Sequence, residues 1–170
     1  MKELIFVRHA KSSWSDPTLD DIKRPLNDRG KSDGPYMAAY CRSLGLIVDH
    51  IISSPAKRAY KTSKYFSAEF PDSRVEKETD LYFGSESDWM HIINELGEDT
   101  RCPAFFSHNP TITYFSNAFL GKKTDNVVTC GIVHLRSTVD LWQEVQYDNT
   151  EVIGYHFPKI IRARMQNTPK

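Results

Sequence analysis

The segment Leu4-Ile5-Phe6-Val7-Arg8-His9-Ala10 decides how the rest of this sequence is interpreted. Its first four residues form a short, continuous run of apolar, β-prone side chains, which is typical of a strand buried on both faces of a parallel sheet. An arginine and a histidine follow directly, where that strand would end. We therefore expect a buried strand that delivers Arg8 and His9 to one edge of a sheet.

Similar apolar runs recur along the chain and alternate with helical patterns. They predict further strands at residues 50–53, 104–107 and 132–135, a weaker one at 152–157, and an edge hairpin or antiparallel strand within 138–147. Between them we expect helices over residues 27–44, from an N-cap at Ser54, followed by Pro55, to about Glu69, from a cap at Ser87 to Gly97, and from Asn109-Pro110 to Gly121. This alternation predicts a three-layer α/β/α fold with a mostly parallel central sheet.

Length and composition limit the classes of protein to consider. The chain has 170 residues, 39% of them hydrophobic, with 22 basic against 22 acidic side chains. This indicates a single domain over residues 1–170, with the tail from about residue 158 peripheral, and it argues against a disordered chain or a dedicated nucleic-acid binder. Apolar runs of four or five residues are far shorter than the roughly 20 that a membrane span needs. We expect no membrane association.

The start of the chain and its cysteines bear on location. Met1-Lys2-Glu3-Leu4 contains no apolar signal-peptide core. Cys41, Cys102 and Cys130 are odd in number and lack CxxC spacing, which favours reduced thiols. We therefore expect a cytoplasmic protein.

Three of the predicted strands end in polar, cationic segments. Arg8 and His9 follow the first, Arg58 lies shortly after the second, and His108 follows the third. Ligands of open α/β sheets bind beyond the carboxyl ends of parallel strands, so these four side chains would converge if the strands are neighbours. Two guanidiniums and two imidazoles suit a small dianion, and phosphate best, because arginine offers a planar fork of donors. Each residue taken alone also fits a surface group or a satisfied hydrogen-bonding partner.

Other polar residues near these segments have weaker signals. Lys11 and Ser15 could add donors to the anion, or could be solvated loop residues. The remaining histidines have no cationic companion, and we interpret them as structural: His50, His91, His134 and His156.

Four motifs, in order, carry a resemblance to a known family. They are Arg8-His9-Ala10-Lys11-Ser12-Ser13-Trp14, Asp21-Ile22-Lys23-Arg24-Pro25-Leu26-Asn27-Asp28-Arg29-Gly30, Ser53-Ser54-Pro55-Ala56-Lys57-Arg58-Ala59 with Thr62, and Ser107-His108-Asn109-Pro110. Together they resemble the SixA-type phosphohistidine phosphatases, the compact branch of the histidine phosphatase, or phosphoglycerate-mutase-like, superfamily. The resemblance covers roughly residues 2 to 120.

The resemblance implies a phosphoglycerate-mutase-like fold and a role for each matched residue. His9 would be the nucleophile that takes the phosphoryl group, through a covalent phosphohistidine enzyme intermediate, and Arg8, Arg58 and His108 would complete the phosphate pocket. Family members use no metal, and the sequence contains no HExxH motif or clustered carboxylates. We expect no cofactor. Neutral imidazole is a competent nucleophile near pH 7, and arginines can spread the charge of a phosphoryl-transfer transition state.

One departure from the family pattern concerns the proton donor. Larger relatives carry a carboxylic acid where this chain has Phe83. Asp80, Glu78 or Glu86 could substitute, but each fits a surface carboxylate equally well. A phosphohistidine needs such an acid less than an alkyl ester does, because its leaving group is itself an imidazole. The missing acid therefore favours P–N over P–O substrates.

The short loops also favour phosphohistidine over small phosphate esters as the substrate. Only a modest loop, residues 10–24, precedes the next motif, and no long lid segment is present. A shallow pocket, with Trp14 and Tyr82 as a possible rim, suits a phosphorylated side chain on another protein. We thus expect a phosphatase acting on phosphohistidine in a histidine phosphotransfer-type protein. The alternatives are a general phosphomonoesterase for small phosphate esters, and a phosphate-binding module without catalysis.

Overall fold

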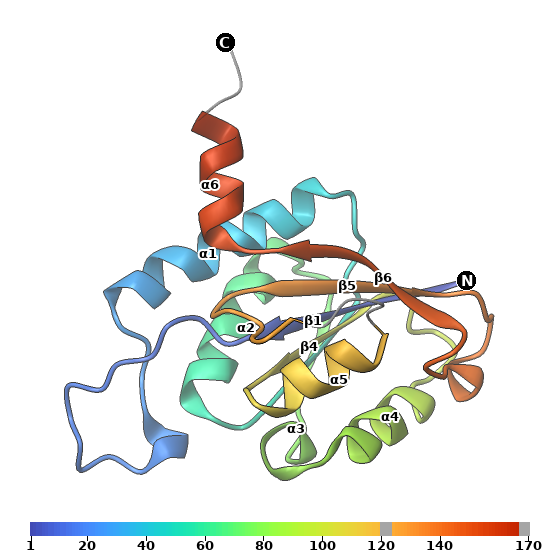
Figure 1. The fold of residues 1–170 in the computed structure, drawn as a ribbon, viewed down its shortest axis with the longest axis horizontal. Coiled ribbons are helices and arrows are strands. Elements are labelled where there is room, and N and C mark those ends of the chain that lie inside the picture. Colours follow the sequence, from blue (N-terminus) through green and yellow to red (C-terminus); the bar gives the residue numbers. More distant parts are fainter. Residues whose placement is uncertain (120–123, 167–170) are drawn as a thin grey trace.

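The computed structural model describes residues 1–119 and 124–166. Its centre is a six-stranded sheet whose strands lie in the order β3-β2-β4-β1-β5-β6 (Figure 1). The strands are β1 (Lys2–Arg8), β2 (His50–Ser53), β3 (Arg74–Lys77), β4 (Pro103–Ser107), β5 (Ile132–Ser137) and β6 (Thr150–His156). The first four strands are mutually parallel, β5 is antiparallel to β1, and β6 is antiparallel to β5. The expected mostly parallel α/β sheet is confirmed.

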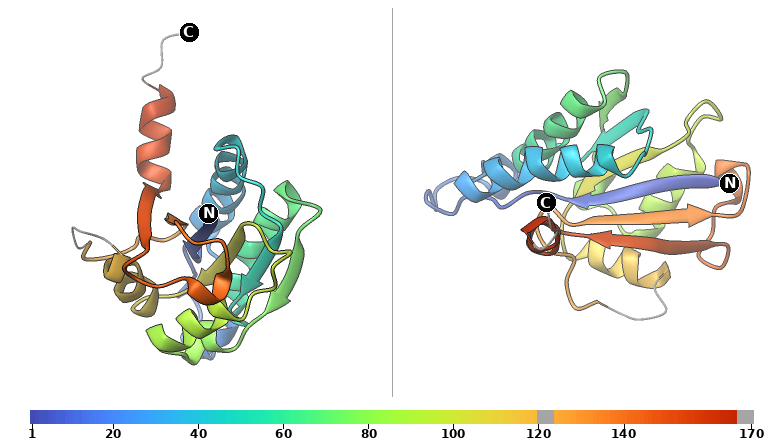
Figure 2. Two further views of the ribbon diagram at one scale, coloured as in Figure 1. Left: turned by 90° about the vertical axis from the view of Figure 1, so that its right-hand side faces the viewer. Right: turned by 90° about the horizontal axis from the view of Figure 1, so that it is seen from above.

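Helices cover both faces of this sheet. They are α1 (Asp28–Ser43), α2 (Lys57–Glu69), the short α3 (Asp80–Phe83), α4 (Glu86–Asn94), α5 (Thr111–Phe119) and α6 (Pro158–Gln166), with 3-10 turns η1 (Asp21–Lys23) and η2 (Trp142–Glu144). Figure 1 shows the strands between α1 on one side and α4 and α5 on the other, and α6 projecting from the rest. The further views in Figure 2 show the same layers.

Alternation along β1 explains why both faces need helices. Ile5 and Val7 pack into the core that contains residues of α1 and α2, whereas Leu4 and Phe6 pack into the core beneath α4 and α5. Successive side chains of a strand point to opposite faces, so a continuous apolar run must be buried on both sides. Phe6 stacks on the Trp89 ring of α4 with ring centroids 5.6 Å apart. The sheet is thereby held as the central layer of the fold.

The segment 138–147 is not the edge strand or hairpin that its alternating pattern predicts. It connects β5 to β6 through η2, and β6 itself supplies the antiparallel edge. The Trp142 ring is fully buried and its Nε1 donates to the Thr100 carbonyl at 2.9 Å. The apolar residues of this segment therefore anchor a loop to the core, which produces a similar spacing without strand pairing.

Several predicted helix starts are also shifted. α2 begins at Lys57, so Ser54 is not its N-cap, and α4 is capped by Ser85, in a capping box with Asp88, instead of by Ser87. The predicted helix end at Gly121 lies outside the described residues. β3 went unpredicted because its sequence, Arg-Val-Glu-Lys, is mostly polar and exposed at the sheet edge.

No helix within the described residues combines the length and apolarity that crossing a bilayer requires. The three cysteines are buried and unpaired. Burial raises the pKa of the Cys41 thiol to about 12, so this thiol is protonated at neutral pH.

Candidate active site

The pairing of β1 with β4 brings two histidines together. Arg8 and Ser107 are register partners in this parallel pair, so the residues that follow them, His9 and His108, leave the sheet side by side. Their ring centroids lie 5.1 Å apart. Both side chains are buried, His9 with 7% and His108 with 8% of its surface exposed. The site therefore lies at the carboxyl edge of the sheet, where ligands of open α/β sheets bind.

Hydrogen bonds assign the His9 ring one tautomer. Its Nδ1 lies 2.7 Å from the carbonyl oxygen of Ala10, and a carbonyl can only accept, so Nδ1 carries the proton. Nε2 consequently presents its lone pair and accepts a hydrogen bond from Arg58 Nε at 3.3 Å. Burial, helped by the positive charges of Arg58 and Arg8, outweighs the Ala10 bond and lowers the pKa of His9 to about 3. His9 is thus a neutral imidazole whose Nε2 can act as a nucleophile.

Ser54 orients the second histidine. The Ser54 Oγ accepts a hydrogen bond from the backbone N–H of Ala56 and lies 2.7 Å from His108 Nε2, and we assign its O–H as donor to that nitrogen. The proton of His108 then lies on Nδ1, which is buried and has no protein partner among the described residues. Burial, with the nearby His9 and Arg58, lowers the pKa of His108 to about 2. His108 is therefore a neutral ring in the folded protein.

Arg8 is held by the segment that precedes β5. Its Nη1 donates to Asn126 Oδ1 at 3.0 Å and to the Val127 carbonyl at 2.7 Å, while its buried Nε has no partner among the described residues. β5 is antiparallel to β1, so its amino end reaches this same edge. Cys130, with a left-handed φ of 59°, donates its N–H to the carbonyls of Arg8 and His9. This segment was not predicted from the sequence, because no local pattern marks it.

Asp21 holds Arg58. The η1 loop extends beyond the carboxyl end of β1 (Figure 1). There Arg58 Nη2 donates to Asp21 Oδ2 at 2.7 Å and Nη1 to the Asp21 carbonyl at 2.5 Å. With the bond to His9, three of the five N–H groups of this guanidinium are engaged. Partial burial opposes ionisation, but bonds from Arg58, Tyr82 and Arg24 outweigh it and lower the pKa of Asp21 to about 2. A negative charge therefore sits against one of the two site arginines.

Asp21 and Ser54 both carried signals in the sequence. Each lies within a motif of the family resemblance, but Ser54 was interpreted as a helix cap and Asp21 received no role. Tyr82, one of the two expected rim residues, packs its ring edge-on against His108 with centroids 5.2 Å apart and donates its O–H to Asp21. The other, Trp14, is exposed and stacks on Arg24.

The structure does not bring the weaker candidates into this cluster. Lys11 is exposed, and its backbone carbonyl accepts the N–H of Asn27. Ser15 Oγ contacts Ser13 Oγ, and Glu78 Oε1 accepts the backbone N–H of Asp80. Within residues 1–119 and 124–166, neither Glu78 nor Asp80 makes a carboxylate bond to the four central side chains, and Glu86 starts α4.

Two guanidiniums and one carboxylate beside two neutral imidazoles give a cluster with net positive charge, which suits a phosphoryl group. No three His, Cys, Asp or Glu side chains of the described part are grouped so that they could hold a metal ion. Metal independence remains a prediction.

Known protein families and solved structures resemble this chain in sequence and in fold. The sequence model described as histidine phosphatase superfamily (branch 1) matches residues 4–89. A structure assigned as phosphohistidine phosphatase SixA from Agrobacterium tumefaciens is similar with a TM-score of 0.78 and 21% identity, over 92% of this chain and 98% of that one. A protein histidine phosphatase SixA complexed with tungstate gives 0.79 and 18%, over 94% and 99%. A mycobacterial glucosyl-3-phosphoglycerate phosphatase gives 0.63 and 14%, over 93% and 97%. These structures show the shared phosphoglycerate-mutase-like fold.

Proposed function

Because the chain belongs to branch 1 of the histidine phosphatase superfamily, we propose that it is a phosphatase that hydrolyses phosphohistidine on a protein substrate, with His9 as the nucleophile. The superfamily and its phosphatase neighbours support hydrolysis of a phosphoryl group. One observation carries the proposal for this chain: the unprotonated Nε2 of a neutral His9 lies in a cluster with His108 and Arg58. A structural neighbour that bears tungstate, a phosphate-like anion, is consistent with an oxyanion pocket.

The proposed reaction has two in-line steps. The lone pair of His9 Nε2 attacks phosphorus while the bond from phosphorus to the leaving nitrogen of the substrate breaks. That nitrogen keeps the bonding electron pair, and the substrate ring, protonated on its other nitrogen, leaves as neutral imidazole. The Nδ1 proton of His9 stays on the ring and strengthens its bond to the Ala10 carbonyl as the ring becomes cationic. Water then attacks the phosphorus, loses a proton, and releases inorganic phosphate with a neutral His9. Arg8 and Arg58 neutralise the equatorial oxygens in both steps.

His108 is proposed to donate a hydrogen bond from its Nδ1–H to a phosphoryl oxygen, while the proton stays on the ring. Ser54 keeps this proton on Nδ1, because its hydroxyl already occupies Nε2. Asp21 is the carboxylate that the described residues bond to this cluster, and it is held ionised on Arg58, so it has no proton to donate. A departing imidazole needs no strong acid. This supports a P–N substrate, and Asp80 and Glu78 remain only predicted donors.

The test is to trap the phosphoenzyme. Incubation with a labelled phosphohistidine peptide should give an acid-labile, base-stable label on the protein, and His9→Ala should abolish both label and turnover. His91→Ala is a matched control, because His91 is an exposed histidine on α4 with no link to the site. Turnover that persists in His9→Ala would end the mechanism.

A general small-molecule phosphomonoesterase is the second candidate, favoured by the similarity to the glucosyl-3-phosphoglycerate phosphatase. Comparing kcat/KM for a phosphohistidine peptide, p-nitrophenyl phosphate and sugar phosphates separates the two, since a preference for alkyl esters contradicts the first proposal. Tight phosphopeptide binding without phosphate release would instead support a non-catalytic module. The cytoplasmic location and the histidine phosphotransfer-type partner remain predictions.

A further inference from the structure

The outer face of α2 carries a stripe of lysines. Lys57, Lys61 and Lys64 are spaced i, i+4 and i+7, which places them on one side of the helix. The opposite side, with Arg58, Thr62 and Phe66, is buried. The helix contains a single carboxylate, Glu69 at its end, although the whole chain has a net charge of zero. Positive charge is therefore concentrated on this exposed face.

These lysines have no partner that neutralises them. Within the described residues, the ion pairs formed by lysines are Lys23 with Asp20 and Lys31 with Asp28. The three lysines of the α2 stripe form none within this part of the chain. Two are instead held over tyrosine rings: Lys61 Nζ is 5.2 Å from the Tyr65 ring centroid, and Lys64 Nζ is 5.7 Å from that of Tyr60. Lys77 of β3 adds a third ammonium, 4.2 Å from the Tyr60 ring.

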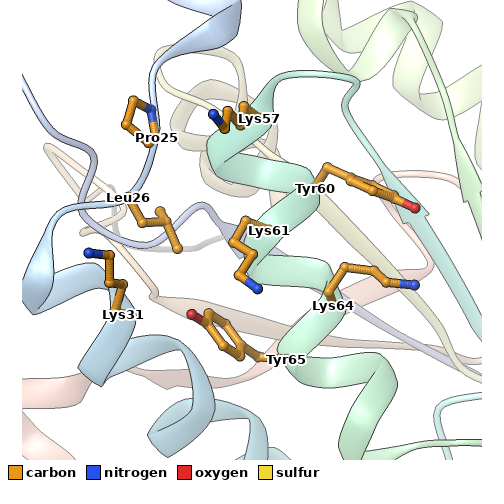
Figure 3. Close-up of a pocket in the computed structure, with 8 residues that line it drawn as sticks. All are labelled: Pro25, Leu26, Lys31, Lys57, Tyr60, Lys61, Lys64 and Tyr65. Atoms are coloured by element: carbon orange, nitrogen blue, oxygen red, sulfur yellow. The ribbon is translucent and has the colours of Figure 1, made fainter. Parts of the chain in front are cut away.

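A cavity of about 550 Å³ lies along this face. Figure 3 shows Lys31 of α1 and Lys61 of α2 extending toward one space, with Leu26 and Tyr65 beside it, while Tyr60 and Lys64 extend to the other side of α2. The residues that line the cavity include four lysines and no carboxylate, although one of them, Lys31, pairs with Asp28 Oδ1 at 3.0 Å. The space beside Lys61 thus combines the apolar and aromatic side chains of Leu26 and Tyr65 with lysine ammonium groups, and Tyr60 with Lys64 extends this cationic, aromatic surface to the other side of α2.

The lysine face leads directly to the candidate active site. Lys57 lies on the outer side of the first turn of α2, and its neighbour Arg58 reaches inward to His9. Lys57 to Lys64 spans seven residues, about 10 Å of helix. A partner seated on this face therefore has an adjoining segment within reach of the site.

We propose that the α2 lysine face (Lys57, Lys61 and Lys64 with Tyr60 and Tyr65) docks an acidic, amphipathic helix of the protein that carries the phosphohistidine. The proposal rests on the proposed function. Carboxylates on that helix pair with the lysine stripe, and its apolar side chains contact the tyrosines and Leu26. A nucleic acid is disfavoured, because the chain has no net positive charge and the cavity is lined by Leu26 and Tyr65 as well as by lysines.

Binding tests the docking independently of catalysis. The probe is a fluorescent 15-residue helical peptide with leucines on one side and glutamates on the other, measured by anisotropy at 50 and 200 mM salt. We expect Lys61→Gln with Lys64→Gln to weaken binding about three- to tenfold and to reduce its salt dependence. Arg101→Gln with Lys159→Gln removes two charges from exposed residues that belong neither to α2 nor to the lining of the cavity, and it should change binding less than twofold. A control peptide in which glutamines replace the glutamates should bind the wild-type protein as weakly as the acidic peptide binds the double variant Lys61→Gln, Lys64→Gln.

Charge exchange provides a second variant. Lys61→Glu should lose the acidic peptide and gain a peptide whose facing glutamate is replaced by lysine. Equal binding of the acidic peptide by wild type and both lysine variants would overturn the docking surface. Tighter, lysine-dependent binding of an oligonucleotide of equal charge would overturn the chemistry assigned to the partner.

Kinetics separate this inference from the proposed function. With a phosphohistidine peptide joined to the acidic helix, the double glutamine variant should raise KM about three- to tenfold and leave kcat and turnover of free phosphohistidine unchanged. An acidic peptide that binds α2 while no phosphohistidine is hydrolysed would overturn the function and retain the docking surface. Hydrolysis of phosphohistidine with an unchanged KM in the double glutamine variant would overturn the docking surface and retain the proposed function.

Discussion

Asp21→Asn tests whether the carboxylate that holds Arg58 competes with phosphate. Asparagine keeps the size of the side chain and one acceptor oxygen, but it removes the negative charge from the guanidinium. In the structure this charge accepts bonds from Arg58 at 2.7 Å, Tyr82 at 2.8 Å and Arg24 at 2.8 Å. A phosphoryl group that binds Arg58 must either displace the Asp21 carboxylate or bind beside its negative charge.

The magnitude follows from the stabilisation of the carboxylate. The pKa of Asp21 falls from 3.8 to about 2, because the three bonds outweigh its partial burial. A shift of about two units corresponds to about 2.5 kcal/mol. Since 49% of the side chain is exposed, solvent screening reduces this to roughly 1 kcal/mol. Phosphate should therefore bind the variant about fivefold more tightly.

The stability of Asp21→Asn should fall while its affinity for phosphate rises. Losing the same interactions should lower the free energy of unfolding by about 1 kcal/mol and the Tm by about 2–4 °C. The assays are calorimetric titration with inorganic phosphate or vanadate at pH 7 and 0.15 M salt, together with thermal denaturation. Asp20→Asn is the matched control, because Asp20 is exposed and pairs with Lys23 instead of Arg58. Unchanged or weaker phosphate binding in Asp21→Asn would refute the competition and make Asp21 part of the anion-binding scaffold.

Three further predictions concern the same edge of the sheet. The pKa values of His9 and His108 are lowered to about 3 and about 2, so both rings stay neutral in the folded protein but take up protons below about pH 6.5 when the chain is unfolded. The free energy of unfolding, measured with urea, should therefore fall by up to about 2.7 kcal/mol for each unit by which the pH is lowered from 5.5 to 4. Ser54→Ala removes the bond that fixes the His108 tautomer, and kcat should fall about 5- to 150-fold, corresponding to about 1–3 kcal/mol, with Tm measured alongside. Gly30→Ala would place a Cβ 2.1 Å from the Lys11 carbonyl oxygen, so thermal denaturation should show a loss of about 1–3 kcal/mol.

Each of these has a clear contrary result. Stability that is level from pH 6.5 to 4 would mean that the two histidines are charged in the folded state. Full activity of Ser54→Ala would remove the hydroxyl from the positioning of His108. Wild-type stability of Gly30→Ala would show that the backbone of the loop after His9 shifts without cost.

The central strands could be predicted because each is a continuous apolar run buried on both faces. The pattern was specific enough to locate β1, β2, β4 and β5, and the residues that follow three of them. It failed at β3, which is polar and exposed, and at 138–147, where apolar residues anchor a loop through Trp142. Periodicity reports which side chains are buried, and a buried loop can produce the spacing of a strand.

Contacts between distant segments could not be predicted. Ser54 and His108 are 54 residues apart, Arg58 and Asp21 are 37 apart, and Arg8 and Asn126 are 118 apart. The motif residues were visible, but nothing local indicated that a serine resembling a helix cap would bond to a histidine, or that an aspartate would occupy a site arginine.

The amino-acid sequence alone determined the α/β architecture and the types of side chain at three strand ends, because burial of apolar runs and the direction of parallel strands follow from local pattern. Only the tertiary structure decided which ring nitrogen of His9 carries the proton, which ring nitrogen of His108 contacts Ser54, and that a carboxylate sits on Arg58. Those properties depend on burial and on hydrogen-bond partners, and both arise when segments far apart in the chain pack against each other.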